Sequence, residues 1–288
     1  MTVKKYPVYS IQQFNCNSVQ ADFYVNTFQK HLVTHPFVEK PHRHNFYVMA
    51  FFTKGSGTHE IDFDSYSVAP GSVFVLQPGQ MHHWSLSEDI GGYVLFYSQE
   101  MYNLYFGEKE IDIFPFFYSN DTKSEIILTK QEMESLQPFF DLIFKESQSD
   151  ELFKKDKIMN LLDLIHIELA RKYQETFASE VHAYNSKLKM FAKVLESHFK
   201  TEKAASFYAN ALHISLKHLN RICNETVNKT TTEIITNRIV LEAKRMLMDK
   251  NSLVSEIALE LGYDDYSYFA RFFKKNTGMS PKDFRLSK

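Results

Sequence analysis

One short layout occurs twice in the C-terminal third of the chain, and it restricts the fold more than any other feature of the sequence. Residues 204–226 (AASFYANALHISLKHLNRICNET) contain two short apolar helical patterns that join near residues 213–215. Residues 255–278 (SEIALELGYDDYSYFARFFKKNTG) repeat this layout, with Gly262 at the join. Apolar residues at helical spacing indicate helices with one inward face. Each segment therefore predicts a helix, a sharp turn and a second helix.

The first segment predicts a buried face and a polar face. The residues expected to point inward are Phe207, Ala209, Leu212, Leu219 and Ile222. The second helix has a polar face whose members are spaced i, i+3, i+4 and i+7, namely Lys217, Asn220, Arg221 and Asn224. Cationic and amide side chains of this kind read guanine and adenine edges in the major groove of DNA.

The second segment carries the signals that begin and end helices. Asp264 or Asp265 is expected to cap the second helix at its start, and Gly278 to end it. SPKD (residues 280–283) begins a last helix with a Ser cap and Pro at the first position. In the second helix Phe269, Phe272 and Phe273 are expected to face the core or its edge, with Ser267, Arg271 and Lys274 toward solvent.

A longer helix is expected between the two segments. TTTEIITNRIVLEAKRMLMD (residues 230–249) opens with a capping box from Thr230 to Glu233, and its apolar stripe passes through Ile234, Ile239 and Met246. Such a helix fixes the distance between the two segments.

Aromatic residues are dense in the second segment, at Tyr263, Tyr266, Tyr268, Phe269, Phe272 and Phe273. A row of aromatic rings can stack the bases of single-stranded nucleic acid. Helical spacing turns several of these rings inward, so we expect them to pack in a core instead.

These motifs together resemble a known family. AxxLxIS…HLNRI, RIxxEAKRML and SEIALELGYDDYSYFARFFKKNTGMSP are similar to the DNA-binding domain of AraC/XylS-family transcriptional regulators. The resemblance implies that two helix-turn-helix units bind two consecutive major-groove segments on one face of DNA. It implies base-reading positions at Lys217, Asn220 and Arg221 in the first unit, and at Tyr266, Ser267, Ala270 and Arg271 in the second. Arg221 and Arg271 are the strongest candidates, and Lys274 is a further one.

The charge distribution fits a DNA-binding C-terminal region. Residues 186–288 contain 18 Lys and Arg against 11 Asp and Glu, a net charge of +7, whereas the remaining residues carry −9. A basic module beside an acidic one is typical of a chain in which only one part meets a polyanion.

The first part of the chain predicts a β-structure. FYVMAFF, THEIDFD, SVFVLQ and GGYVLFYS are short apolar or alternating runs, separated by KGSG, VAPGS and QPGQ. They indicate an antiparallel sandwich or barrel. The expected fold class is α+β. The family resemblance implies a cupin-like β-barrel in residues 1–128 with trailing helices in residues 129–175, a linker in residues 176–185, and an all-α DNA-binding domain in residues 186–288.

The trailing helices have two apolar stripes. The first contains Leu136, Phe139, Phe140, Ile143 and Phe144, and the second contains Ile158, Leu161, Leu162, Ile165 and Leu169. Both helices can simply pack on the sheet, whereas the second stripe also suits a two-fold interface in a homodimer. We expect a dimerisation segment here.

Two histidines precede the first strand pattern. In KPHRHNFYVMAFF (residues 40–52), His42 and His44 alternate along an extended segment, so both imidazoles face one side. Two imidazoles on one side are part of a possible transition-metal site. This stretch and APGSVFVLQPGQMHHW (residues 69–84) resemble the signatures of the cupin-like effector barrel found in many members of the family.

The expected metal set is incomplete. In metal-binding cupins a glutamate follows the H-x-H pair, and a later His completes the set; His82 fits the later His, but the glutamate position falls at Val48 or Met49. Three imidazoles still suit zinc, so metal ligation, contact with a small molecule and a structural hydrogen bond stay open as roles. We expect no metal and no cofactor. The candidate ligand-binding residues are His42, His44, Phe46, Tyr47, Phe74, His82, Trp84 and Tyr93.

The expected function is a sequence-specific DNA-binding transcription regulator controlled by a small molecule in the barrel, with no catalytic residues. The expected partners are double-stranded operator or promoter DNA, an unidentified effector, a second copy of the chain and RNA polymerase, and no membrane. Two alternatives remain, namely a constitutive regulator whose barrel only dimerises, and a cupin metalloenzyme fused to a DNA-binding tail.

The remaining composition favours the cytoplasm. Cys16 and Cys223 are the only cysteines and lie far apart in the sequence, which is atypical of a disulfide framework. The N-terminal residues contain no long apolar run after their lysines, so we expect no signal peptide.

Overall fold

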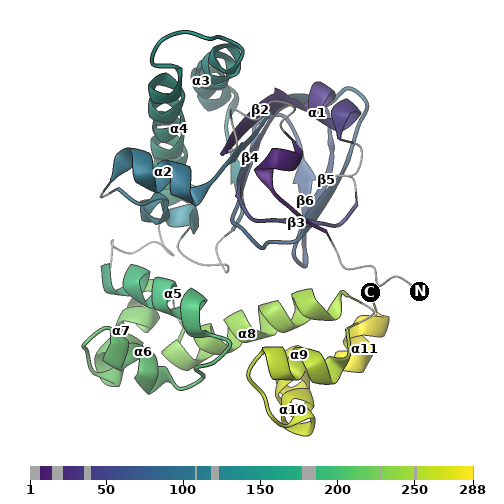
Figure 1. The fold of residues 1–288 in the computed structure, drawn as a ribbon, viewed down its shortest axis with the longest axis vertical. Coiled ribbons are helices and arrows are strands. Elements are labelled where there is room, and N and C mark those ends of the chain that lie inside the picture. Colours follow the sequence, from purple (N-terminus) through teal and green to yellow (C-terminus); the bar gives the residue numbers. More distant parts are fainter. Residues whose placement is uncertain are drawn as a thin grey trace. The chain divides into compact units, whose positions relative to one another are not determined.

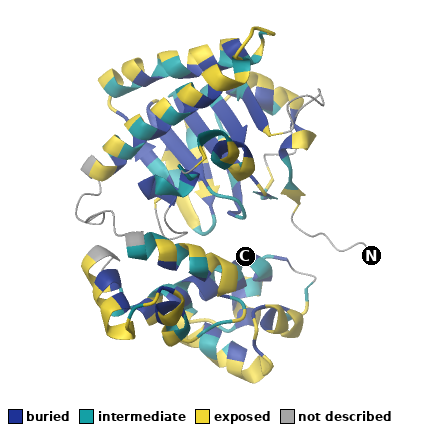
Figure 2. Cartoon of the chain, turned by 60° about the vertical axis from the view of Figure 1, so that its left-hand side comes forward, coloured by how far each residue is buried: buried dark blue, intermediate teal, exposed yellow. Residues whose placement is uncertain are grey.

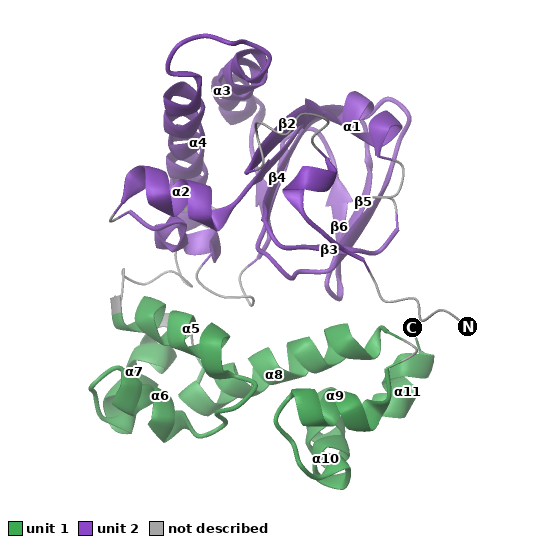
Figure 3. Cartoon of the chain, in the orientation of Figure 1, with its two compact units in different colours: residues 1–5, 119–121, 177–288 green, residues 6–118, 122–176 purple. Residues whose placement is uncertain are grey.

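The computed structural model describes residues 7–14, 22–35, 40–107, 109–117, 123–176, 186–227, 229–249 and 252–287 (Figure 1). They divide into two compact units: the described residues up to 176 belong to one, and residues 186–287 to the other (Figure 3). The first unit contains every described strand, and the second contains helices alone. The α+β fold class is therefore confirmed. The expected linker lies outside the described residues, apart from Thr176 at the end of a helix.

The N-terminal unit is built from two antiparallel sheets, with strand orders β10–β7–β4–β9–β2 and β6–β5–β8. The strands of the larger sheet are β2 (Phe23–Thr27), β4 (Tyr47–Lys54), β7 (Ser72–Leu76), β9 (Gly91–Tyr97) and β10 (Glu125–Ile127). Those of the smaller sheet are β5 (Gly57–Ile61), β6 (Asp64–Val68) and β8 (His82–Leu86). A short parallel pair joins β1 (Val8–Tyr9) to β3 (Arg43–His44).

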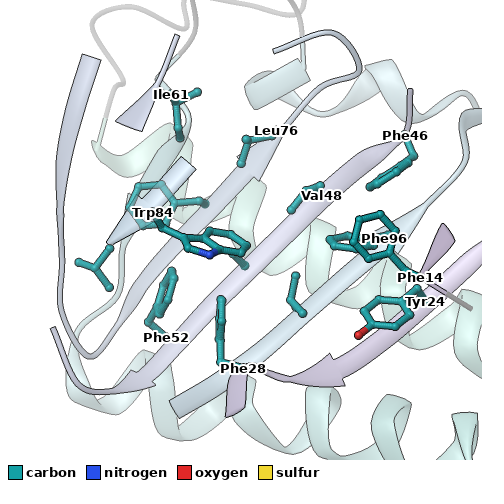
Figure 4. Packing of buried hydrophobic residues seen from close by; sticks show 14 of the residues in the cluster. Phe14, Tyr24, Phe28, Phe46, Val48, Phe52, Ile61, Leu76, Trp84 and Phe96 are labelled. Atoms are coloured by element: carbon teal, nitrogen blue, oxygen red, sulfur yellow. The ribbon is translucent and has the colours of Figure 1, made fainter. Parts of the chain in front are cut away.

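One apolar core lies between the two sheets. Because side chains alternate along a strand, Val48 and Phe52 of β4 point to one side of the larger sheet, where they join Ile61 of β5 and Trp84 of β8 (Figure 4). These four side chains are at most 3% exposed. We call the space enclosed by the two sheets the barrel.

The other side of the larger sheet is covered by two long helices, α3 (Lys130–Ser147) and α4 (Lys154–Thr176). Phe51 of β4 contacts Phe140 of α3, with ring centroids 4.7 Å apart. The hydroxyl of Tyr97 on β9 lies 2.8 Å from Nε2 of His166 on α4. Both faces of the sheet are therefore buried.

The apolar stripe of α4 is used inside the chain. Ile158, Leu162, Ile165 and Leu169 are at most 5% exposed, because α4 packs against α3 and the 3₁₀ helix η4 (Pro115–Phe117). Leu161, the fifth residue of the stripe, is half-buried. Most of the stripe is therefore covered within the chain, and dimerisation through residues 129–175 stays a prediction.

Several short elements were not expected from the sequence. They are α1 (Phe28–Thr34), α2 (Gln99–Phe106) and the 3₁₀ helices η1 (Ile11–Gln13) and η3 (Ile111–Ile113). The run THEIDFD, expected as one strand, is a hairpin in which β5 ends at Ile61 and β6 begins at Asp64. Asp62 at its turn has a φ of 54° and accepts a hydrogen bond from the backbone N–H of Met81 (3.2 Å).

The C-terminal unit contains seven described helices. They are α5 (Ser186–His198), α6 (Ala205–Ala211), α7 (Leu216–Val227), α8 (Thr231–Leu247), α9 (Val254–Glu260), α10 (Tyr266–Thr277) and α11 (Pro281–Leu286). Here and elsewhere in the described ranges, no helix is long and apolar enough to cross a membrane.

The expected helix ends are confirmed. Thr230 and Glu233 form the capping box of α8, and the Asp265 side chain accepts a hydrogen bond from the backbone N–H of Tyr268 (2.9 Å) at the start of α10. Gly278 ends α10 in the left-handed conformation, with a φ of 79°. Ser280 caps α11.

The inward face of the first helix-turn-helix unit differs from the expected one at one position. Ala209, Leu212 and Leu219 are at most 1% exposed, as expected. Tyr208, however, is fully buried, whereas Phe207 is half-buried. The Tyr208 ring packs edge-on against Phe191 of α5 (5.5 Å between centroids), and its hydroxyl donates to the Glu202 carbonyl (2.8 Å).

Candidate functional sites

The helices of the C-terminal unit each have a buried side and an exposed side (Figure 2). On α7, Lys217, Arg221 and Asn224 are exposed, whereas Leu219 and Cys223 are buried on the opposite side. The structure thus places three of the four predicted residues on one solvent-facing surface. Two cationic groups and one amide are available there to hydrogen-bond acceptors.

Asn220, the fourth predicted residue of α7, is half-buried and already has a partner. Its side-chain oxygen accepts a hydrogen bond from the backbone N–H of Thr231, the first residue of α8 (2.9 Å). A helix leaves its first backbone N–H groups without partners inside the helix. Asn220 therefore holds the start of α8 against α7, and this bond uses one of the two lone pairs of its side-chain oxygen.

On α10, Ser267, Arg271 and Lys274 are exposed, as expected, and Tyr266 is 45% exposed. Ala270 is half-buried between them. The second helix-turn-helix unit therefore also presents a cationic and hydroxyl-bearing surface.

Asp265 lies at the edge of this surface. The pKa of its carboxyl is lowered, chiefly by the hydrogen bond from the backbone N–H of Tyr268, and Arg271 adds to this effect. The aspartate is thus an ionised cap.

The aromatic residues of the second helix-turn-helix unit mostly pack inward. Phe269 and Phe273 are fully buried, and Tyr263 is 8% exposed and contacts the Phe269 ring at 5.4 Å. Tyr266 and Tyr268 are the exposed members. This division agrees with the expected core and provides no continuous stack of exposed rings.

Four histidines meet inside the barrel, and we call them the histidine cluster. They are His42, His44, His59 and His82, each at most 3% exposed. The ring centroids of His42 and His82 lie 4.4 Å apart, those of His44 and His82 4.9 Å, and those of His59 and His82 5.2 Å. The three predicted histidines are therefore brought together, and His59 was missed because nothing local marks its strand as facing them.

Hydrogen bonds orient the rings of the cluster. Nδ1 of His42 lies 2.8 Å from the Lys40 carbonyl oxygen, and Nδ1 of His44 lies 2.9 Å from that of Phe46. Nε2 of His59 and Nδ1 of His82 are 2.9 Å apart.

Burial keeps these rings neutral. It lowers the pKa of His44 and His59 from 6.5 to about 3 and that of His42 to about 4. Burial, joined by the neighbouring histidines, also lowers the pKa of His82 well below its ordinary value. The cluster therefore offers uncharged nitrogens, which donate or accept hydrogen bonds according to the tautomer.

Several nitrogens of the barrel are buried without a hydrogen-bond partner. They are Nε2 of His31, His44 and His82, Nδ1 of His59, and Nε1 of Trp84. Trp84 lies within 5.3 Å of both His59 and His82, measured between ring centroids. Buried polar atoms usually have a partner, so this is an unusual concentration of unused hydrogen-bonding capacity.

Two more histidines of the barrel were missed. His31 of α1 is fully buried, and its Nδ1 lies 2.9 Å from the hydroxyl of Tyr24. His35 directly follows α1 and is 6% exposed. Their spacing of four residues was an available signal, but no helix was expected there.

The N-terminal residues 7–14 pack onto this cluster. Tyr9 pairs with His44 through the β1–β3 ladder, and its ring centroid lies 5.2 Å from that of His42. Phe14 packs edge-on against Phe46, with centroids 5.9 Å apart. An aromatic segment thus covers the histidine rings on this side.

Of the predicted aromatic ligand residues, Phe46, Phe74 and Trp84 belong to the barrel core (Figure 4 labels Phe46 and Trp84). Tyr47 and Tyr93 lie on the helix-covered side of the sheet, so the expectation for these two is corrected. Tyr47 stacks on Tyr97 (5.8 Å), and Tyr93 stacks on Phe140 (5.9 Å).

The position expected for a metal-binding carboxylate is apolar. Val48 is fully buried in the barrel core. In the part of the chain that the structure describes, no three His, Cys, Asp or Glu side chains are arranged to hold a metal ion.

Two family models match the chain. Residues 28–162 match the model of an AraC-like ligand binding domain, and residues 208–287 match that of a helix-turn-helix domain. The first match contains the histidine cluster, and the second contains α7 and α10.

Relatives with curated functions match most of the chain. The HTH-type transcriptional activator RhaR of Mannheimia succiniciproducens is 20% identical over 250 residues, covering 85% of this chain and 86% of the relative. The lactose operon transcription activator of Staphylococcus xylosus is 20% identical over 240 residues, covering 83% of each. The solved structure of ToxT from Vibrio cholerae is 13% identical, covers 92% of this chain and 98% of that chain, and aligns with a TM-score of 0.44. The chain thus belongs to the AraC family of transcriptional regulators, with an AraC-like ligand-binding domain and a helix-turn-helix DNA-binding domain.

Proposed function

We propose that the exposed faces of α7 and α10 read operator DNA and that the barrel interior binds the effector. Membership of the family makes the chain a DNA-binding transcription regulator with a small-molecule ligand domain. The observation that supports the assignment best is the pair of exposed, cationic helix faces, one in each helix-turn-helix unit.

The two helices, which we call the recognition helices, enter consecutive major-groove segments. Arg221 and Arg271 donate to base edges or phosphates, and Lys217 and Lys274 neutralise phosphates. Because Asn220 already caps α8, its position is fixed by that helix, and its amide nitrogen donates to the DNA.

The remaining predicted residues have smaller roles. Asn224 and Ser267 hydrogen-bond to bases or the backbone, Tyr266 packs along the sugar-phosphate backbone, and Ala270 allows close approach. Phosphate neutralisation releases counterions, so affinity falls steeply with salt concentration.

The effector contacts the predicted barrel residues that face the interior, namely His42, His44, Phe46, Phe74, His82 and Trp84. Binding changes DNA occupancy only if the effector has a higher affinity for one arrangement of the chain than for another. A regulator whose DNA affinity no small molecule alters is the alternative outcome.

We extend the proposal to the setting in which the chain works. The chain acts in the cytoplasm, and it acts by binding and not by catalysis. It forms a homodimer through a surface other than the α4 stripe. At the promoter it contacts RNA polymerase. Residues 1–128 hold the effector, residues 129–175 support dimerisation, residues 176–185 link the domains, and residues 186–288 bind DNA.

The experiment begins with selection of a binding sequence from random duplex DNA by the full chain. Gel shifts then measure the affinity of Arg221→Ala and Arg271→Ala, each expected to lose about 5- to 150-fold, the equivalent of about 1–3 kcal/mol. Lys155→Ala, which removes an exposed cation from the N-terminal unit, is the control and keeps full affinity. Unchanged affinity in both arginine variants contradicts the assignment.

A further inference from the structure

We propose that the effector is an uncharged molecule that presents hydroxyl groups to the histidine cluster. The inference rests on the proposed function, in which the barrel interior is the effector site. The inference depends on the distribution of protons and lone pairs among the ring nitrogens of the barrel.

Two rings of the cluster are held as acceptors. The Nδ1 atoms of His42 and His44 lie 2.8 Å and 2.9 Å from backbone carbonyl oxygens, which can only accept hydrogen bonds. Each Nδ1 therefore carries the proton, and each neutral ring keeps a lone pair on Nε2. That of His44 is buried without a partner.

The same space also contains donors. Nε1 of Trp84 can only donate, and it is buried without a partner. His59 and His82 share one hydrogen bond of 2.9 Å between Nε2 and Nδ1. Whichever ring donates it, one of the two outer nitrogens, Nδ1 of His59 or Nε2 of His82, is a donor and the other is an acceptor.

A hydroxyl group matches this mixture, because it donates one hydrogen bond and accepts others. An ammonium group only donates, so it cannot satisfy the N–H of Trp84. A carboxylate only accepts, so it faces the lone pairs of His42 and His44 unless these rings become protonated. Burial disfavours that protonation, since it lowers their pKa values to about 4 and about 3.

The hydrogen bonds that orient the cluster come from neutral groups. His42 and His44 bond backbone carbonyl oxygens, and His59 and His82 bond each other. An ion bound here would therefore lose its hydration without gaining a counter-charge.

The test uses the full chain and triads of compounds with one carbon skeleton and one changed group. Suitable triads are benzyl alcohol, benzoate and benzylamine; hexanol, hexanoate and hexylamine; and glucose, gluconate and glucosamine. Binding is followed by the melting temperature and by the fluorescence of Trp84, the single tryptophan of the chain. The expected result is that a neutral member binds at least about tenfold more tightly than its acid and amine counterparts.

Variants connect that binding to the cluster. His44→Leu removes the acceptor and is expected to weaken binding at least about tenfold, whereas His44→Gln, which retains an acceptor, weakens it less. His83→Gln, at the half-exposed neighbour of His82, is the matched control and binds normally. If His44→Leu fails to fold, Trp84→Phe removes the donor instead, and the melting temperature alone reports binding.

The outcomes separate this inference from the function on which it rests. Tighter binding of an acid or an amine overturns the hydroxyl assignment and leaves the barrel as the effector site. Binding of a neutral compound that His44→Leu does not weaken overturns the assignment to this cluster. No response to any member, with DNA affinity unchanged by all of them, contradicts both proposals.

Discussion

The ammonium group of Lys203 donates a 2.6 Å hydrogen bond to the carbonyl oxygen of Leu261, which joins the loop after α5 to the turn of the second helix-turn-helix unit. The same nitrogen donates to the carbonyls of Phe199 (2.8 Å) and Lys200, and lies 5.2 Å from the centroid of the Tyr263 ring. This contact therefore joins the loop that leads into the first helix-turn-helix unit to the turn of the second unit.

Replacement of Lys203 by Met should loosen this connection. The change leaves three carbonyl oxygens without their donor and should lower the free energy of unfolding by about 1–3 kcal/mol. We also expect a larger loss of affinity for DNA that contains both major-groove segments than for DNA that contains only the segment bound by α7. Gel shifts on the two duplexes measure the difference. Equal losses on both would indicate general destabilisation and contradict a positioning role.

Lys200→Ala is the control for this variant. Lys200 is also near the end of α5 and pairs with Glu260 of α9 at 2.8 Å, but both side chains are exposed. Exposed ion pairs contribute about 0–1 kcal/mol, so this variant should behave like the original chain. Lys203→Arg, which keeps the charge and several donors, should recover part of the two-segment affinity.

Gly262→Ala should destabilise the second helix-turn-helix unit strongly. Gly262 has a φ of 75°, and a Cβ atom there would lie 2.0 Å from the carbonyl oxygen of Lys200. Strained backbone and overpacking together should cost about 2–5 kcal/mol. Gly278→Ala is the matched control, because Gly278 has a φ of 79° but nothing within 4 Å of its added Cβ; it should cost only about 1 kcal/mol. Urea unfolding followed by circular dichroism compares them, and equal costs would refute the steric argument.

Helix ends were predictable from the sequence because a cap is a local interaction. Asp265 and Ser280 bond backbone groups three residues ahead, and Gly278 adopts a conformation that few other residues accept. The tandem helix-turn-helix layout followed from such signals and from helical periodicity.

The sides of the larger sheet were not predictable in the same way. Both of its faces are buried, so β4 reads as a continuous apolar run without polar alternation. The strand register pairs Tyr47 with Tyr97 and Phe51 with Tyr93. Only this register shows that Tyr47 and Tyr93, which were predicted as ligand residues, lie under the helices. Likewise, His59 reaches the cluster because β5 pairs with β8, where it lies opposite Trp84.

The hydrogen bond between Asn220 and Thr231 leads to a prediction that separates stability from DNA reading. Asn220→Ala should lower the free energy of unfolding by about 0.5–2 kcal/mol, because a backbone N–H at the start of α8 loses its acceptor. Asn220→Asp keeps an acceptor and should retain stability, yet it adds a negative charge beside α7 and should weaken DNA binding. Urea unfolding and gel shifts measure the two effects. Loss of stability in the Asp variant equal to that in the Ala variant would rule out the capping role.

Buried neutral histidines should make the N-terminal unit sensitive to acid. Burial lowers the pKa of His44 and His59 from 6.5 to about 3. In the unfolded chain each ring takes up a proton near pH 6.5. The free energy of unfolding is therefore highest above that pH, and it falls as the pH decreases toward 3. Each ring contributes up to about 1.4 kcal/mol per pH unit. Urea unfolding at pH 7, 6 and 5, followed by Trp84 fluorescence, measures this slope. His44→Leu should reduce it and the exposed control His218→Gln should not; an unchanged slope in His44→Leu would show that His44 does not cause the acid sensitivity.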